Sequence, residues 1–148
     1  MQGSLRAFAA IAAFLLSASA FADPPVYTGL FSSRAVSGYD TVAYFTEGRP
    51  VKGERRFSTE YEGATWLFSS AENLARFEAD PEAYAPQYGG YCAWAVSQGY
   101  TASGDPDNWA IEDGKLYLNY DDDVQATWNE DRAGFIELAD ENWPSLVD

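Results

Sequence analysis

The chain has 148 residues, with 9 Lys and Arg against 23 Asp and Glu, a formal net charge of −14, no His and one Cys. This length suits one compact domain. The negative charge argues against nucleic acid or an anionic membrane as a partner, because both attract basic surfaces. The lack of His and the single Cys exclude Ser-His-Asp and Cys-His nucleophiles, His metal ligands, intramolecular disulfides and Cys-rich zinc sites.

Residues 1–22 are typical of a secretory signal peptide. Arg6 precedes an apolar run over residues 7–16, and Ala20 and Ala22 fit the small-residue cleavage pattern. The run is shorter than the roughly 18 residues that a membrane-spanning helix needs. Because no Arg-Arg pair precedes it, the general secretory route is favoured. We therefore expect a periplasmic or secreted protein whose residues 23–148 form a single domain, with no membrane insertion after signal cleavage.

Two hairpins are predicted in the rest of the chain. Polar and apolar residues alternate over residues 56–68 around Gly63, which predicts a half-buried antiparallel pair. A second pair is predicted from residues 108–112 and 115–120, because Asp113-Gly114 is a strong two-residue turn signal. A short strand is also expected over residues 26–31.

The helices expected from the sequence are short. In chain order they cover residues 41–45, a segment from Ser69 or Ser70 to Asp80, residues 81–84, residues 88–98, and two segments between Val124 and Pro144. Asp40 is placed to cap the first of them, and Ser69 and Glu72 have the spacing of a capping box. No repeat of 20–50 residues is visible. Without a parallel crossover pattern, the predicted class is α+β, with two antiparallel hairpins packed with three to four short helices.

Four segments carry a family resemblance. Residues 38–45, 53–84, 88–99 and 113–120 resemble the exported YHS-domain proteins. The resemblance implies a hairpin-and-helix core over residues 57–84. Metal-associated YHS modules carry Cys after the second strand and again on the helix, where this chain has Ser69, Ser70 and then Ala71. The metal ligands of those relatives are therefore not carried over.

The most informative segment is a pair of glycines before the only cysteine. Gly89 and Gly90 together cost a helix about 2 kcal/mol relative to two alanines, which indicates close approach of a packed neighbour or of a ligand. We expect a site where residues 88–99 meet residues 39–45. The candidate ligand-binding residues are Tyr39, Asp40, Tyr44, Gln87, Tyr88, Gly89, Gly90, Tyr91, Trp94 and Lys115. The alternative interpretation is that these aromatic residues fill the core of a small protein.

Cys92 is the candidate metal ligand. A thiolate favours copper(I). Two further interpretations are that Cys92 is a ligand to haem iron or a redox-sensitive thiol. The opposing interpretations are a buried structural thiol and an intermolecular disulfide that joins a homodimer. The resulting hypothesis is an exported YHS-type binding module for a small ligand or a metal such as copper. The alternatives are an envelope interaction or dimerisation module and an enzyme that uses Tyr and carboxylate groups, for which no catalytic residue is assigned.

Overall fold

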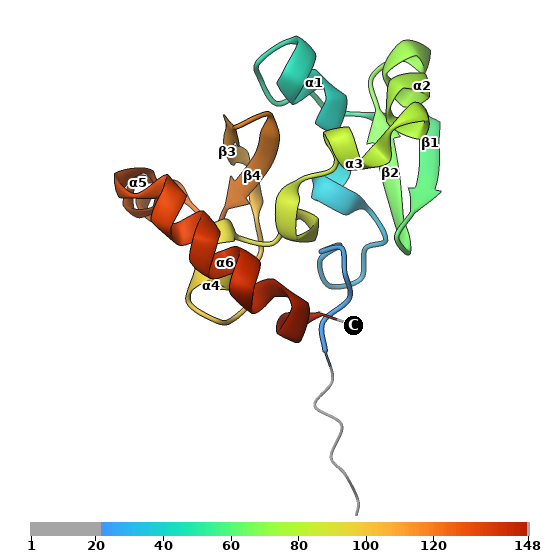
Figure 1. Ribbon diagram of the computed structural model, residues 1–148. Coiled ribbons are helices and arrows are strands. Elements are labelled where there is room, and N and C mark those ends of the chain that lie inside the picture. The colour runs from blue at the N-terminus through green and yellow to red at the C-terminus, as the bar shows by residue number, and fades with distance from the viewer. Residues whose placement is uncertain (1–21, 148) are drawn as a thin grey trace, which may run out of the picture.

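Two antiparallel hairpins and six α-helices, with two short 3-10 helices, form the part of the chain that the computed structural model describes, residues 22–147 (Figure 1). Strand β1 (Glu54–Tyr61) pairs with β2 (Ala64–Phe68), and β3 (Asp105–Glu112) pairs with β4 (Lys115–Asn119). The α+β class and both hairpins are confirmed. The structure has more helices than the three to four that were expected, because several of them are single turns. The expected signal peptide lies, apart from Ala22, outside the described residues.

The helices connect and cover these hairpins. In chain order they are η1 (Ala35–Gly38), α1 (Thr41–Thr46), α2 (Ala71–Ala79), α3 (Pro81–Tyr84), η2 (Gln87–Gly90), α4 (Ala93–Ser97), α5 (Asp122–Glu130) and α6 (Arg132–Leu146). Among the described residues, no helix has both the length and the apolar composition needed to cross a bilayer.

Side-chain caps define where the first helices begin. The Asp40 carboxylate accepts hydrogen bonds from the Val42 and Ala43 amides at 2.9 and 3.2 Å, so the predicted cap is confirmed. For α2 the predicted capping box is wrong. Ser70 is the cap, accepting from the Asn73 amide at 3.1 Å, and Glu72 forms an ion pair with Arg76 instead of reaching back.

The helix expected over residues 88–98 is also wrong in its first half. Tyr88 and Gly89 have left-handed φ angles of 57° and 60°, and α4 begins only after an extended Tyr91 and Cys92. The Gly89 carbonyl accepts from the Tyr27 amide at 3.0 Å, and a Cβ atom at Gly89 would collide with the Pro25 carbonyl. The close neighbour of this glycine is therefore the N-terminal segment, which forms no strand where one was expected over residues 26–31.

The same order of elements occurs twice. Unit 1 (residues 35–79) contains η1, α1, β1, β2 and α2, and unit 2 (residues 87–130) contains η2, α4, β3, β4 and α5. Corresponding residues are 51 or 52 positions apart. Each unit opens with two left-handed residues, which are Val36 and Ser37 in unit 1 and Tyr88 and Gly89 in unit 2. The sequence shows no repeat of 20–50 residues, and this structural repeat has a slightly longer period, of 51 or 52 residues.

Details of the two hairpins support this correspondence. Both registers shift at the same place, between Glu54 and Ser58 in β1 and between Asp105 and Trp109 in β3. Helices α2 and α5 both end at an aspartate, Asp80 with φ −155° and Asp131 with φ −153°. The repeat is faint in sequence because the identical residues are few and lie mostly in turns and caps. They include Gly38 and Gly90, Tyr39 and Tyr91, Gly53 and Gly104, Gly63 and Gly114, and Asp80 and Asp131.

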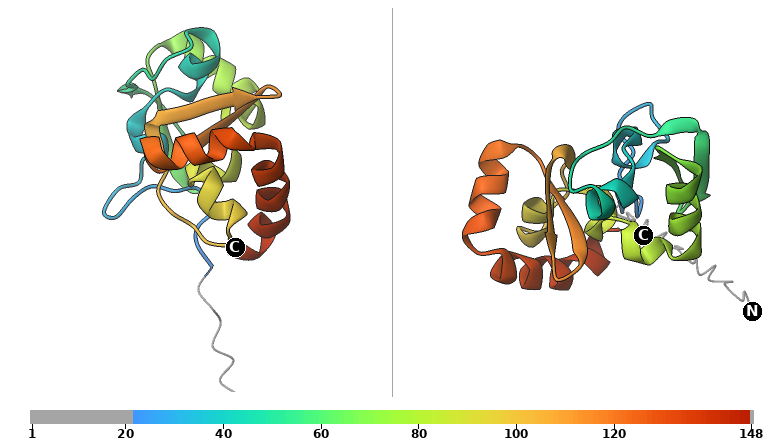
Figure 2. Two further views of the ribbon diagram at one scale, coloured as in Figure 1. Left: turned by 90° about the vertical axis from the view of Figure 1, so that its left-hand side faces the viewer. Right: turned by 90° about the horizontal axis from the view of Figure 1, so that it is seen from above.

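Strand β4 belongs to the cores of both units. Leu116 and Leu118 are buried with the aromatic core of unit 1, whereas Tyr117, on the opposite face, packs with Trp128 and the buried residues of unit 2. Figure 2 shows the two units side by side, with α6 running along unit 2. Because successive side chains of β4 point into different units, this strand joins the two units, and a junction lies between them.

Candidate ligand-binding site

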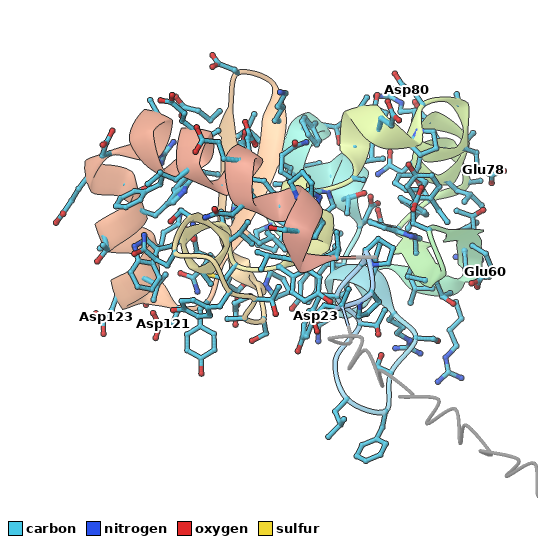
Figure 3. All side chains as sticks on the ribbon, turned by 60° about the horizontal axis from the view of Figure 1, so that its bottom comes forward. Asp23, Glu60, Glu78, Asp80, Asp121 and Asp123 are labelled. Atoms are coloured by element: carbon cyan, nitrogen blue, oxygen red, sulfur yellow. The ribbon has the colours of Figure 1, made fainter. Side chains whose placement is uncertain are left out.

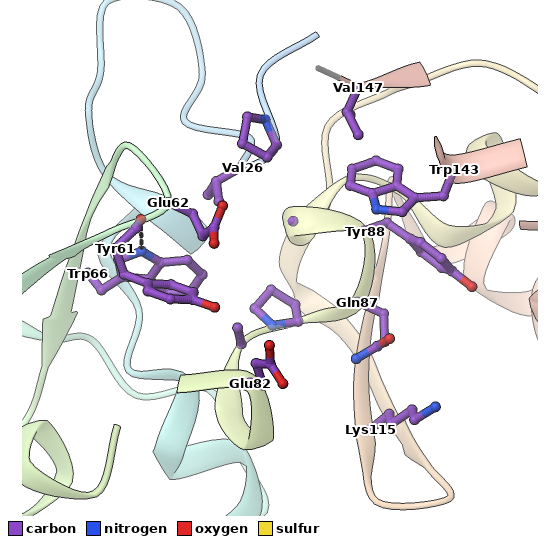
Figure 4. Close-up of a pocket in the computed structure, with 14 residues that line it drawn as sticks. Val26, Tyr61, Glu62, Trp66, Glu82, Gln87, Tyr88, Lys115, Trp143 and Val147 are labelled. Carbon is purple, nitrogen blue, oxygen red and sulfur yellow. Dashed lines mark hydrogen bonds between the residues drawn. The ribbon is translucent and has the colours of Figure 1, made fainter. Parts of the chain in front are cut away.

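A groove with a volume of about 460 Å³ lies at the junction between the two units (Figure 4). The β1–β2 hairpin and α3 supply one side, and η2, the start of β4 and the end of α6 supply the other. Pro25, Val26 and Val147 contribute from the two ends of the described chain. The groove therefore exists only when distant segments have come together.

Aromatic rings form both walls. Tyr61 and Trp66 lie with their centroids 6.0 Å apart, and the Trp66 indole Nε1 donates to the Tyr61 carbonyl at 2.9 Å. On the other wall Tyr88 and Trp143 lie 5.7 Å apart, and the Tyr88 hydroxyl donates to the Asp140 carboxylate at 2.8 Å. Because hydrogen bonds fix Trp66 and Tyr88, the two walls keep their orientation before a ligand arrives.

Charged groups are distributed unevenly along the groove. Glu62 and Glu82 lie on the unit 1 side, and Lys115 lies beside Gln87 at another end (Figure 4). Burial, and then the negative charges of Glu62 and Glu82, raise the pKa of Tyr61, so both carboxylates act on its hydroxyl. None of these three charged residues takes part in the four ion pairs found among residues 22–147. One end of the groove is therefore acidic.

Local backbone structure explains where the two carboxylates lie. Glu62 occupies the turn of the first hairpin with a φ of 52°, followed by Gly63 with a φ of 76°, so its side chain leaves the tip of the hairpin. Pro81 opens α3 and Glu82 follows in the first helical turn, where a negative charge is favourable. Both side chains are exposed, which leaves them accessible to a ligand.

The predicted site residues fall into separate groups. Gln87, Tyr88, Gly89 and Lys115 line the groove. Sequence reasoning missed the other polar and aromatic groups, which are Tyr61, Glu62, Trp66, Glu82 and Trp143. The Glu62-Gly63 turn is a local signal that an acidic side chain projects from the hairpin. No local signal places Trp143 opposite Trp66, because the pairing depends on packing of α6.

Asp40 lies outside the groove and is fully buried. Besides capping α1, its carboxylate accepts from the Ser69 amide at 2.9 Å, the Ser69 hydroxyl at 2.6 Å and the Asn73 side-chain amide at 2.8 Å. Five donors therefore satisfy this charge. Asp40 joins the start of α1 to the junction between β2 and α2.

The nearby tyrosines also serve the interior. The Tyr44 hydroxyl donates to the Pro106 carbonyl at 2.6 Å and so connects unit 1 to unit 2. Burial, and then the charge of Asp107, raise the pKa of Tyr44 far above its usual value. Tyr39 packs, half buried, against the core of unit 1. The segment 39–45 therefore stabilises the fold and does not face the groove.

Tyr91 and Gly90 hold the start of unit 2 in place. The Tyr91 hydroxyl donates to the Pro24 carbonyl at 3.0 Å, and burial raises the pKa of Tyr91 to about 12. Gly90 is buried beside the side chains of Pro86 and Leu118 and has a φ of 85°. Both residues position the N-terminal segment and η2, which form part of the groove wall.

Cys92 and Trp94 lie at a separate, smaller cavity of about 240 Å³. Cys92 is 1% exposed, and its Sγ lies 3.6 Å from the Asn119 side-chain oxygen. Burial raises the pKa of the Cys92 thiol, although backbone hydrogen bonds partly oppose the shift. A neutral thiol is a poor metal ligand. Within residues 22–147 no group of three or more His, Cys, Asp or Glu side chains is placed to hold a metal ion.

The hairpin with its following helix and the groove beside it define an α+β protein with a ligand-sized concave site. Residues 42–88, from α1 to η2, match the family model of the YHS domain. The predicted family resemblance is confirmed for this part of the chain. Neither the search of curated proteins nor the search of solved structures found a match.

Proposed function

We propose that the chain is a binding module that holds a small, positively charged organic molecule in the groove between its two units. The observation that carries the proposal is the pair of exposed carboxylates, Glu62 and Glu82, beside the aromatic walls and without an ion-pair partner. Ligand sites of this kind combine aromatic walls with a few polar groups that fix orientation.

The physical chemistry of the groove favours an organic cation. A cation above an aromatic face gains about 0.5–2 kcal/mol, and indole is the most favourable ring. Trp143 and Tyr61 are half buried and offer such faces in the groove, whereas Trp66 is 1% exposed and stacks on Phe77 behind the wall. A formal net charge of −14 on the whole chain raises the local concentration of cations and speeds their association. Lys115 repels a positive group in the part of the groove beside Gln87, so the ligand is expected to place its positive charge beside Glu62 and Glu82.

Two molecules of equal shape test this proposal. Choline and its neutral isostere 3,3-dimethylbutan-1-ol differ only in a nitrogen with a positive charge or a carbon, and calorimetric titration measures the affinity of each. The proposal expects saturable binding of choline at least ten-fold tighter than binding of the isostere. Equal affinities, or no saturable binding of choline, contradict it.

Substitutions then locate the charge. The double variant Glu62→Gln and Glu82→Gln is expected to lose most of the preference for choline, because the amides keep the shape of the groove without its charge. Glu78→Gln combined with Glu130→Gln is the matched control, since it also removes two negative charges, from residues that are exposed outside the groove (Glu78 is labelled in Figure 3). If the control loses as much affinity as the double variant, general charge attraction explains the binding.

We also propose that the module acts after export, on the basis of the signal peptide expected at residues 1–22. N-terminal sequencing of protein recovered from outside the cytoplasm checks this directly. The proposal expects a mature chain that starts at Asp23. A recovered chain that keeps Met1 contradicts it.

An exposed apolar loop supports a second candidate function, self-association. Leu30 and Phe31 are 84% and 100% exposed, and Phe31 has a left-handed φ of 64°. A bulky residue in this conformation and fully in water is unusual and favours a protein contact. Sedimentation of the wild-type chain and of Phe31→Ser tests for a homodimer, and a monomer for both chains contradicts this candidate.

A further inference from the structure

We propose that the cavity beside Cys92 is a second binding site, for a small neutral apolar molecule about the size of one aromatic ring. Corresponding positions in the two units carry different residues around this cavity. In unit 1, Asp40, Ser69 and Asn73 meet where the first helix touches the hairpin-to-helix junction. Their counterparts in unit 2 are Cys92, Tyr120 and Val124, so a polar cluster is replaced by a largely apolar one.

The hydrogen bonds that hold this junction together in unit 2 come from another residue. The Asn119 side-chain oxygen accepts from the Trp94 amide at 3.0 Å, and its nitrogen donates to the Gln125 side-chain oxygen at 2.8 Å. Asn119 corresponds to Phe68 in unit 1. Asn119 thus joins α4 to β4 and α5. Among the described residues, the side chains of Tyr120 and Val124 make no hydrogen bond at this junction, and Cys92 makes only the weak one from its Sγ to the Asn119 oxygen at 3.6 Å.

Cys92, Tyr120 and Val124 line the cavity of about 240 Å³. Besides Cys92, its walls include Trp94, Tyr100, Ala102, Tyr120 and Val124. Tyr100 and Tyr120 are 48% and 52% exposed, so the cavity opens to solvent on their side. The walls are mainly rings, methyl groups and a neutral thiol, so a charged ligand would lose its hydration without gaining partners there.

The size of the cavity limits the ligand. An engineered apolar cavity of about 150 Å³ in another protein binds benzene or xenon. A cavity of about 240 Å³ therefore has room for one substituted ring. This apolar class differs from the cation proposed for the groove, and the two sites have no lining residue in common.

Toluene and two phenylalanine variants test the inference in solution. Val124→Phe fills the cavity from α5, whereas Ala126→Phe places the same ring on the exposed face of that helix. Toluene is expected to raise the midpoint of thermal unfolding saturably for the wild type and for Ala126→Phe. The affinity of Val124→Phe for toluene is expected to fall at least ten-fold. The absence of saturable binding by the wild type, or unchanged binding by Val124→Phe, overturns the proposal.

Two further measurements keep the inference separate from folding and from the groove. A crystal of the wild-type protein under xenon pressure is expected to show xenon beside Cys92 Sγ, and a cavity without xenon overturns the proposal even if Val124→Phe fails to fold. Choline binding by a folded Val124→Phe is expected to match the wild type. Failure of toluene binding with intact choline binding therefore overturns only this second site.

Discussion

Asp40 and Cys92 occupy the same backbone position in the two units. The Asp40 amide donates to the Val51 carbonyl at 2.8 Å, and the Cys92 amide donates to the Ala102 carbonyl at 2.9 Å. Each residue also directly precedes a short helix. One position therefore carries a hydrogen-bonded carboxylate in unit 1 and a neutral thiol beside a cavity in unit 2, and the two residues have different consequences for stability and binding.

Replacing Asp40 with Asn is expected to lower the free energy of unfolding by about 2–3 kcal/mol, because its carboxylate accepts five hydrogen bonds in the interior. The Asn side chain has one acceptor oxygen in place of the two carboxylate oxygens, and its NH2 group would point toward the N–H and O–H groups that now donate to Asp40. Urea unfolding measures the change. Asp107→Asn is the control, since Asp107 is exposed. Equal losses for the two variants would contradict the role given to Asp40.

Gly89→Ala is expected to destabilise the protein by about 3 kcal/mol or more, because a left-handed alanine is strained and its Cβ has no room beside the Pro25 backbone. Gly99→Ala isolates the strain. Gly99 has a φ of 89° with nothing within 4 Å of the added atom, so a loss of about 1 kcal/mol is expected. Thermal unfolding of both variants checks the difference, and a similar loss at the two sites would show that the N-terminal segment does not pack on Gly89.

Alkaline pH is expected to destabilise the fold. Burial raises the pKa of Tyr91 and Tyr117 to about 12 and the pKa of Tyr44 and Tyr88 still higher, against an ordinary value of 10.0. Below pH 10 these groups are neutral in both states, so they add no pH dependence. Above pH 10 they ionise first in the unfolded chain, and the free energy of unfolding falls as pH rises toward 12.

Absorbance of tyrosinate during an alkaline titration measures this effect. The four buried tyrosines are expected to ionise late, together with the loss of secondary structure. A single titration near pH 10 with the fold intact would contradict their burial.

Cys92 is expected to react slowly with a disulfide reagent in the native protein at pH 8 and rapidly in concentrated urea. Its sulfur is buried, and burial raises its pKa, so little thiolate is present. The same burial predicts a monomer on a nonreducing gel. Complete modification within mixing time, or a dimer that reductant removes, would show that the thiol is accessible.

Local signals were sufficient to predict much of the fold from the sequence. Asp113-Gly114 and Gly63 marked both hairpin turns, and Asp40 marked the start of α1. The helix predicted over residues 88–98 was wrong in its first half. The spacing of small residues there is typical of a helix, and nothing in it indicates the left-handed conformation of Tyr88. Val36 and Ser37 adopt the same conformation at the start of unit 1, so it belongs to the repeated unit and is not visible in the local pattern of residues 88–98.

The site was less predictable than the fold. Gln87, Tyr88, Gly89 and Lys115 were candidates that line the groove, but Trp66 and Trp143 line the same groove only because α6 returns across the junction between the units. The repeat was missed for a related reason. Most of its identical residues serve turns and caps, whereas many of its core positions differ in size, as in Phe77 of unit 1 and Trp128 of unit 2.

The indole N–H signals of the five tryptophans give the sharpest test of a cation site between the two units, because each side chain reports on a different place. Trp66 and Trp143 line the groove, Trp94 lines the Cys92 cavity, and Trp109 and Trp128 pack against the cores. In a proton–nitrogen correlation spectrum, choline is expected to shift the Trp143 signal saturably while the Trp94 and Trp128 signals stay in place. Choline-dependent shifts confined to Trp94 or Trp128, or no shift at all, would contradict a cation site between the two units.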